Sequence, residues 1–391
     1  MTERTPPQLS ERTRKIEPTA IRYMYSLAEA QGGDLVRLEI GEPDFDTPGH
    51  IIDHAAEAAH GGATHYTSNA GAIEFREAVA EKSARDHGLD VDPENVVAVA
   101  GASEAILLVF LATTDFGDEI VLPTPAWPQY DMQIGFAGAE TVEVPLSPED
   151  DFALDADAVI EAINDDTGCV VVNSPSNPTG RIYEPEPVRA VAEAAADHGI
   201  YVLLDEVYSG LVFEERGRSL ASELDTGNVG LINACSKEHA MTGWRLGWLV
   251  GPDPLIDAAI KLHPGTTASP SSVSQHAGVA ALTGTQEPIE EMYEAFRERR
   301  DYVHDRIESM PVVSAPYTQG SFYAFLDVRE LEGTCGEIAE RLLADYEVVT
   351  VPGGGLGSGG EGFLRLSFAN SLDRLELGLD RIERMVRDEQ A

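Results

Sequence analysis

Short apolar runs alternate with longer mixed stretches through the middle of the chain. Each run has glycine or polar residues at its ends, and the runs lie at 95–100, 119–122, 169–173, 200–204, 230–233 and 247–251. Such runs are typical of buried strands, and stretches with helical spacing, such as 187–198, lie between several of them. The pattern predicts an α/β fold with a mostly parallel sheet sandwiched by helices, and ligands bound beyond the carboxyl ends of its strands.

The carboxyl-terminal part of the chain has a different pattern. A long charged helix is predicted at 288–310, and strands are predicted at 321–328, 346–351 and 363–369. Leu372, Leu375, Leu379, Ile382 and Val386 are spaced by three and four residues, which predicts an amphipathic helix. The glycine-rich segment 353–360 is expected to form a mobile loop near the site.

These patterns predict three parts. Residues 1–45 form an N-terminal arm together with part of a small domain, residues 46–285 form a large domain, and residues 286–391 form a smaller α+β domain. A chain of 391 residues is long enough for such a division.

The charge of the chain restricts its partners. Lysine and arginine total 27 against 68 aspartate and glutamate residues, a formal net charge of -41. That excess repels nucleic acids and anionic membranes, so neither is expected as a partner. Salt screens self-repulsion between acids, so the composition favours a halophilic source; an acidic interaction surface is the alternative.

The cysteines and the apolar runs of the chain indicate its location and redox state. The three cysteines are widely spaced, which predicts neither a disulfide framework nor a metal site. The N-terminus has no apolar signal core, and no apolar run approaches the ~20 residues of a membrane span. We therefore expect a soluble protein of a reducing compartment, the cytoplasm.

The segment 235–248 (CSKEHAMTGWRLGW) carries the strongest candidate chemistry. The amine of Lys237 can form a Schiff base with an aldehyde cofactor, and Ser236 and Arg245 suit a phosphate. The alternative is a lysine and an arginine on an ordinary amphipathic loop.

Three further positions call for a charged ligand. Asp205 ends an apolar run, where a carboxylate is costly without a cation; capping the next turn or pairing with an arginine is the alternative. Ser103 begins the predicted helix 104–112 as its N-cap, next to backbone N–H groups that can bind an anion. Arg365, within an apolar strand, fits a carboxylate; a buried structural ion pair is the alternative.

These motifs, with Asn177 in NPTG, resemble the class I/II pyridoxal-phosphate (PLP) aminotransferases, in particular the aspartate aminotransferase-like enzymes of fold type I, from Gly41 to the last helix. The resemblance implies that residues 46–285 bind PLP through Lys237. It assigns the cofactor to Tyr66, Ala102, Ser103, Trp127, Asn177, Asp205, Tyr208, Ser236, Lys237 and Arg245, and the substrate to Gly41, Trp127, Asn177 and Arg365.

Within this set the resemblance gives each residue a role. Asp205 faces the pyridine nitrogen, Asn177 and Tyr208 the phenolic oxygen, and Trp127 stacks on the ring. Ala102, Ser103, Ser236 and Arg245 bind the phosphate, and Tyr66 reaches the partner's phosphate across a homodimer interface.

The implied reaction is a ping-pong transfer of an amino group from an L-amino acid to a 2-oxo acid. Lys237 is the catalytic residue and proton carrier, and Arg245 lowers its pKa. Aspartate with 2-oxoglutarate is the leading pair of substrates, although no second cation for a distal carboxylate is identified. A PLP lyase, cyclase or oxidase is the alternative, a ligand-sensing regulator is a remote one, and no metal site is predicted.

Overall fold

The alternating pattern of the central region produces one large sheet. The structure is a computed structural model and describes residues 8–10, 13, 16, 18–214 and 219–390. Within them, seven strands form the central sheet in the order β2-β8-β7-β6-β5-β3-β4. Strand β8 is antiparallel to both of its neighbours, and the remaining pairs are parallel. The strands are β2 (Val96–Val99), β3 (Glu119–Thr124), β4 (Glu140–Pro145), β5 (Thr167–Asn173), β6 (Tyr201–Asp205), β7 (Val229–Ala234) and β8 (Gly247–Val250).

Successive side chains of each strand point to opposite faces of the sheet, so each face has its own core. Val97 and Val99 pack under α5 (Ala102–Thr113), α6 (Gln129–Ala137) and α10 (Asp253–Leu262). Val96 and Ala98 belong to the opposite core. That core is covered by α3 (Gly49–His60), α4 (Ile73–His87), α7 (Ala156–Ala162), α8 (Pro185–Asp197) and α11 (Ser272–Thr283). Helices therefore cover both faces, as predicted.

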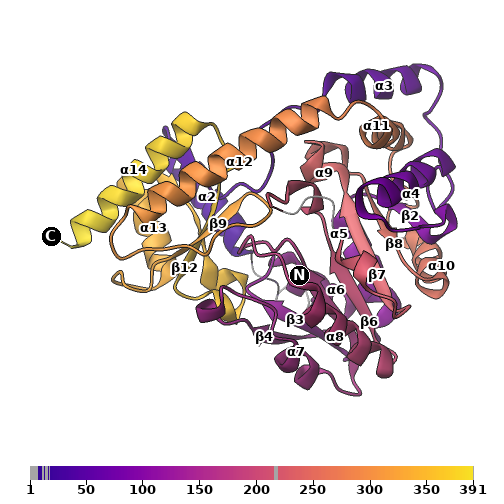
Figure 1. The fold of residues 1–391 in the computed structure, drawn as a ribbon, viewed down its shortest axis with the longest axis horizontal. Helices are drawn as coiled ribbons and strands as arrows, with labels where there is room; N and C mark the ends of the chain where they lie inside the picture. The colour runs from indigo at the N-terminus through magenta and orange to yellow at the C-terminus, as the bar shows by residue number, and fades with distance from the viewer. Residues whose placement is uncertain (1–7, 11–12, 14–15, 17, 215–218, 391) are drawn as a thin grey trace, which may run out of the picture.

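The two ends of the chain share a third core, which occupies the left of Figure 1. Strands β11 (Val351–Pro352), β12 (Phe363–Ser367) and β9 (Tyr323–Asp327) form an antiparallel sheet, and β1 (Val36–Arg37) pairs in parallel with β10 (Val348–Val349). The helices of this part are α2 (Ala20–Gln31), α12 (Glu287–Glu308), α13 (Cys335–Tyr346) and α14 (Leu372–Glu389). Helix α12 runs from the side of α11 to that of α14 (Figure 1).

The predicted α/β class with a mostly parallel, helix-covered sheet is confirmed, and the predictions differ from the structure in local detail. The edge strand β4 was not predicted. The predicted strand 346–351 divides into β10 and β11, which pair in different sheets. Both are short and buried, so burial alone could not separate them.

The glycine-rich segment is not a loose loop. It forms two 3₁₀ helices, η7 (Gly353–Leu356) and η8 (Ser358–Gly360), packed closely on their surroundings. A Cβ at Gly355 would overlap Ala20 of α2, and one at Gly357 would contact the Thr124 side chain at the end of β3. The glycines permit close packing here.

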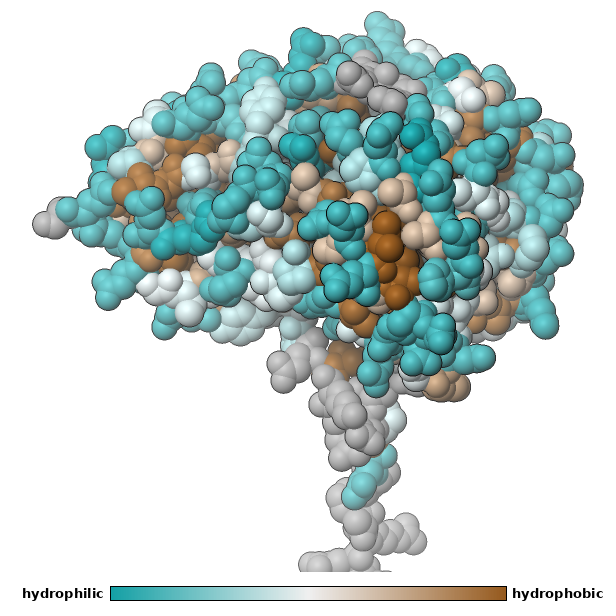
Figure 2. Space-filling view, turned by 60° about the horizontal axis from the view of Figure 1, so that its bottom comes forward, coloured by the Kyte–Doolittle hydropathy of each residue, from teal (hydrophilic) through white to brown (hydrophobic). Residues whose placement is uncertain are grey.

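One face of the molecule is mostly hydrophilic. Hydrophilic side chains cover most of the face in Figure 2. Cys169, Cys235 and Cys335 are buried, and none of them forms a disulfide. Across the described ranges, no helix is both long and apolar enough to cross a membrane.

Candidate active site

A pocket of about 480 Å³ lies where the parallel strands of the central sheet end. Strands β5, β6 and β7 end at Asn173, Asp205 and Ala234, and all three residues line it. The pocket also receives residues from α2 and from the antiparallel sheet of the carboxyl-terminal part. It brings together every predicted site residue except Tyr66: Gly41, Ala102, Ser103, Trp127, Asn177, Asp205, Tyr208, Ser236, Lys237, Arg245 and Arg365.

Lys237 lies on a single helical turn, α9 (Cys235–Glu238), directly after β7. Its Nζ donates a hydrogen bond to the carbonyl oxygen of Gly41 at 2.5 Å. Burial lowers the pKa of Lys237 to about 8, and the cations Arg365 and Arg245 lower it further. The predicted contribution of Arg245 is therefore present, but burial is the larger cause. A substantial fraction of this amine is neutral near pH 8.

Asp205 is buried and forms no ion pair with a described residue, although the charge of Lys237 acts on it from a greater distance. Its Oδ2 accepts a hydrogen bond from the Tyr130 hydroxyl at 2.5 Å, and its Oδ1 accepts one from the backbone N–H of Val207 at 3.1 Å. Among the described residues no arginine pairs with it, and burial raises its pKa to about 6. A cationic ligand atom in the pocket would relieve this cost and lower the pKa.

The segment after β2 forms an anion-binding corner. Helix α5 begins at Ala102, so the N-cap is Gly101 and not Ser103, which lies in the first turn. This corrects the predicted helix start, and it leaves the first N–H groups of the helix directed at the pocket. Gly101 has φ 87°, and a Cβ there would contact the Arg245 guanidinium. The guanidinium donates to the carbonyls of Thr242 at 2.9 Å and Ala100 at 3.3 Å.

Arg365 on β12 is 1 % exposed and has no carboxylate partner among the described residues. It donates to Asn177 Oδ1 at 3.0 Å and to the carbonyl of Glu39 at 2.7 Å, and it lies 4.4 Å from the centre of the Tyr323 ring. The structural ion pair that was the alternative for this residue is therefore not observed. A buried guanidinium whose hydrogen-bond acceptors are a neutral amide and a carbonyl is suited to an anionic ligand.

Aromatic side chains line the space between these charged groups. Trp127 lies at the pocket and contacts Tyr130 edge to face at 5.6 Å between ring centres. The Tyr208 hydroxyl is 3.1 Å from that of Tyr323. Burial raises the pKa of Tyr208 well above its ordinary value, so this phenol is a neutral hydrogen-bonding group.

Tyr66 lies outside the pocket of its own chain. Its side chain is 92 % exposed, the highest value among the large hydrophobic residues described as exposed. It therefore has no role in the pocket of a single chain.

The sequence did not identify several pocket residues. Tyr130 lies in the first turn of α6, three residues after Trp127, and this closeness in sequence was the one available signal for it. Thr19, Ile21 and Arg22 come from α2, whose sequence carries no sign that its first turn reaches the pocket. Tyr323 resembles any other aromatic residue of an apolar strand.

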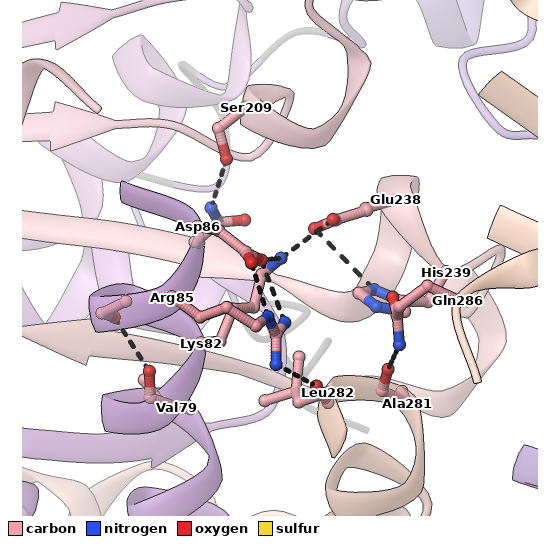
Figure 3. Close-up of polar contacts among 12 residues, drawn as sticks. Val79, Lys82, Arg85, Asp86, Ser209, Glu238, His239, Ala281, Leu282 and Gln286 are labelled. Atoms are coloured by element: carbon pink, nitrogen blue, oxygen red, sulfur yellow. Dashed lines mark hydrogen bonds and ion pairs between the residues drawn. The ribbon is translucent and has the colours of Figure 1, made fainter. Parts of the chain in front are cut away.

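A cluster of ionic side chains joins α4 to the end of α9 (Figure 3). Lys82 of α4 contacts Glu238 at 2.9 Å and Asp86 at 2.8 Å, and its side chain is 4 % exposed. The cluster keeps the pKa of Glu238 and of Asp86 at about 2 despite burial, because Lys82 and Arg85 offset it. We call Lys82, Asp86 and Glu238 the buried ion cluster.

The donor set fits the cofactor that the sequence resemblance implies. Asp205 forms no ion pair with a described residue, the start of α5 with Arg245 offers donors to a phosphate, and Lys237 offers a partly neutral amine. These are the groups a pyridine nitrogen, a phosphate and an aldehyde require. The described ranges contain no cluster of His, Cys, Asp or Glu side chains that could hold a metal ion.

Comparisons with known proteins agree on one family. The family model of aminotransferase class I and II matches residues 33–382. The chain is 37% identical to an aspartate aminotransferase of Geobacillus stearothermophilus, across 97% of this chain and 99% of that protein. It is 33% identical to aromatic-amino-acid aminotransferase 2 of Thermococcus litoralis, across 98% and 99%. The solved structure of aspartate aminotransferase from Thermus thermophilus with maleate is 36% identical, with a TM-score of 0.92 over 97% of this chain and 100% of that one.

Proposed function

The chain belongs to the class I and II aminotransferases, which are PLP-dependent enzymes, and on that premise we propose that its amino donor is L-aspartate and its acceptor 2-oxoglutarate. The observation that carries aminotransfer is Arg365, a buried guanidinium that pairs with no carboxylate among the described residues and lines the pocket that holds Lys237. Several relatives of similar identity are aspartate aminotransferases.

When bound, PLP supplies an aldehyde that carries the amino group and a ring that accepts electrons from the substrate's Cα. We assign its phosphate to Ala102, Ser103, Ser236 and Arg245. Asp205 would hold its pyridine nitrogen, Asn177 and Tyr208 would donate to its phenolic oxygen, and Trp127 would stack on the ring and limit access of water; all four residues line the pocket.

We assign substrate binding and proton transfer to residues of the chain. Arg365 binds the α-carboxylate of the amino acid, and its hydrogen bond to Asn177 fixes the plane of the guanidinium. Lys237 takes the proton from Cα through Nζ, which its lowered pKa of about 8 allows near neutral pH. Asp205 remains ionised opposite a cation, because an opposite charge lowers the pKa of a carboxyl.

The first experiment measures half of the reaction. PLP-loaded protein is mixed with one L-amino acid at a time and no acceptor, and the pyridoxamine phosphate and 2-oxo acid formed are quantified by chromatography. We expect equimolar products, fastest with aspartate. Ammonia without pyridoxamine phosphate would contradict aminotransfer, and faster conversion of alanine or phenylalanine would contradict the proposed donor.

We also propose that the active unit is a homodimer in which Tyr66 of one chain contacts the phosphate bound by the other. The support is its exposure of 92 % outside its own pocket. Tyr66→Phe should weaken PLP binding about fivefold, the effect of one lost hydrogen bond. Titration measures this, and light scattering measures the mass; a monomer that binds PLP at full affinity would contradict the proposal.

The acidic composition supports a further proposal, that the enzyme works in a salt-rich cytoplasm. Screening reduces repulsion among the 68 acidic residues. The melting temperature should therefore rise from dilute to molar KCl. A melting temperature that is independent of salt would contradict this proposal.

A further inference from the structure

Four basic side chains line the pocket, and three of them already have a partner or an assigned ligand. Lys237 donates to Gly41, Arg245 lies at the phosphate corner, and Arg365 is directed at the α-carboxylate. The fourth is Arg22. Among the described residues no carboxylate pairs with it, although the chain has 68 acidic residues against 27 basic ones.

Arg22 lies in the first turn of α2, and the structure fixes that turn. The Thr19 side chain caps the helix by accepting a hydrogen bond from the backbone N–H of Arg22 at 3.4 Å. Thr19, Ile21 and Arg22 together form one edge of the pocket. The Arg22 guanidinium lies 5.6 Å from the centre of the Tyr25 ring, one helical turn further along, and is exposed. It is a charged group at the pocket edge, and no described residue offers it a competing anion.

Helix α2 is held against the pocket by contacts of side chains other than Arg22. Met24 and Ala28 are buried in the core shared by the chain ends, and the Tyr23 hydroxyl donates to Glu340 at 2.7 Å. On the pocket side, Ala20 lies so close to Gly355 that any side chain at 355 would overlap it. A glycine at this position allows the first turn of α2 to approach the pocket.

The chemistry of this edge favours a second carboxylate. A dicarboxylate bound through its α-carboxylate at Arg365 brings a second negative charge into a pocket that contains the carboxylates of Glu42 and Asp205, and whose cations Lys237 and Arg245 are assigned to the cofactor. That charge is repelled unless a cation meets it. A guanidinium can bind it with two parallel hydrogen bonds, which survive high salt better than a distant charge does.

We propose that Arg22 binds the distal carboxylate of dicarboxylate substrates and thereby sets the preference of the enzyme for them over neutral amino acids. The inference rests on the proposed function and names the residue that makes aspartate the preferred donor. Arg22 is then a specificity-determining residue: it contacts the part of the substrate that does not react.

The test compares Arg22→Gln and Arg22→Lys with wild type in the PLP-loaded enzyme. The kcat/KM values for aspartate and for alanine are measured at one fixed salt concentration. We expect Arg22→Gln to lose roughly 10- to 100-fold for aspartate and less than about twofold for alanine, since one charge-assisted pair is removed. Arg22→Lys should recover part of the loss, because it keeps the charge without the planar geometry.

Arg384→Gln is the matched control. Arg384 of α14 is also an exposed arginine without a described carboxylate partner, and it lies 5.0 Å from the centre of the Tyr346 ring. It does not line the pocket, so its removal changes the net charge equally and should leave both donors unchanged.

A binding measurement separates this inference from the proposed function. The dissociation constant of maleate, a dicarboxylate that does not react, is measured by calorimetry for wild type and Arg22→Gln. We expect weaker binding by roughly 10- to 100-fold in the variant. An unchanged constant, or an equal loss for aspartate and alanine, would overturn the role of Arg22 and point to a cation from a partner subunit. A wild type that converts no amino acid would overturn the proposed function, while the maleate result would still decide the role of Arg22.

Discussion

The floor and the wall of the pocket are built in different ways. The floor consists of residues that follow the carboxyl ends of central-sheet strands, among them Ser103, Trp127, Asp205 and Lys237. The wall comes from the first and last parts of the chain: Arg22, Gly41, Tyr323 and Arg365.

The difference follows from distance along the chain. A floor residue is positioned by a strand only a few residues away, so its place is a local property of an α/β sheet. A wall residue is positioned by the core in which α2 packs beside β9 and β12. We therefore expect floor substitutions to damage the reaction with every donor, and wall substitutions to alter which donor is preferred.

The largest expected effect tests the floor. Lys237→Ala should abolish transamination, with kcat reduced at least about 10⁴-fold for aspartate and alanine alike, because the group that we propose to hold the cofactor and move the proton is lost. Steady-state assays with both donors measure it. Lys261→Ala is the matched control, since this exposed lysine of α10 lies away from the pocket. Substantial turnover by Lys237→Ala would contradict the assignment.

The next effect tests what supports the floor. Lys82→Met should lower the free energy of unfolding by about 3–5 kcal/mol, because Glu238 and Asp86 of the buried ion cluster lose their shared cation. Urea unfolding at constant salt measures it. Because Glu238 directly follows Lys237 on α9, PLP affinity should fall in parallel. A stability loss below about 1 kcal/mol would mean that water replaces the cation.

The same cluster predicts a pH dependence. The pKa of Glu238 is lowered from 4.5 to about 2, so its contribution to stability is complete above pH 4.5 and is lost as the pH falls toward 2. The difference in unfolding free energy between wild type and Glu238→Gln should therefore be constant near neutral pH and shrink below pH 4.5. A difference that persists unchanged to pH 3 would contradict the ionic origin.

A smaller effect is expected from the electrostatics of the floor. Asp205→Asn preserves the size of the side chain and can still accept from Tyr130, but it removes the charge opposite the pyridine nitrogen. We expect kcat to fall roughly 10²- to 10³-fold for all donors. The ratio of aspartate to alanine kcat/KM should stay unchanged; a shift in that ratio would place Asp205 in substrate selection instead.

The smallest effect tests the packing of α2 against η7, which positions part of the wall. Gly355→Ala forces α2 away from η7, because the added Cβ overlaps Ala20. We expect the aspartate-to-alanine ratio to fall by roughly two- to fivefold while PLP affinity is retained, since binding energy varies by about 1 kcal/mol for such small displacements. Gly135→Ala is a glycine control outside the pocket, because an added Cβ there meets no other atom within 4 Å. An unchanged ratio would show that the position of α2 does not affect selectivity.

Much of the floor was predictable, because each element that places it has a local signal. The runs that became β5, β6 and β7 identified where Asp205 and Lys237 emerge, and the start of α5 was misplaced by only two residues, with Gly101 as its cap. The wall was predicted unevenly. Arg365 was found because an arginine within an apolar strand is anomalous, but Arg22 lies on an exposed helix where arginines are common.

The sequence by itself therefore determined the α/β class, the family resemblance and the chemical groups of the floor, because strand patterns and short motifs act over a few residues. Only the tertiary structure decided that the glycine-rich segment is packed and that α2 reaches the pocket at Arg22. It also decided that no described carboxylate pairs with Arg365. These features depend on contacts between segments more than 300 residues apart, such as Ala20 with Gly355, and no local pattern encodes such a distance.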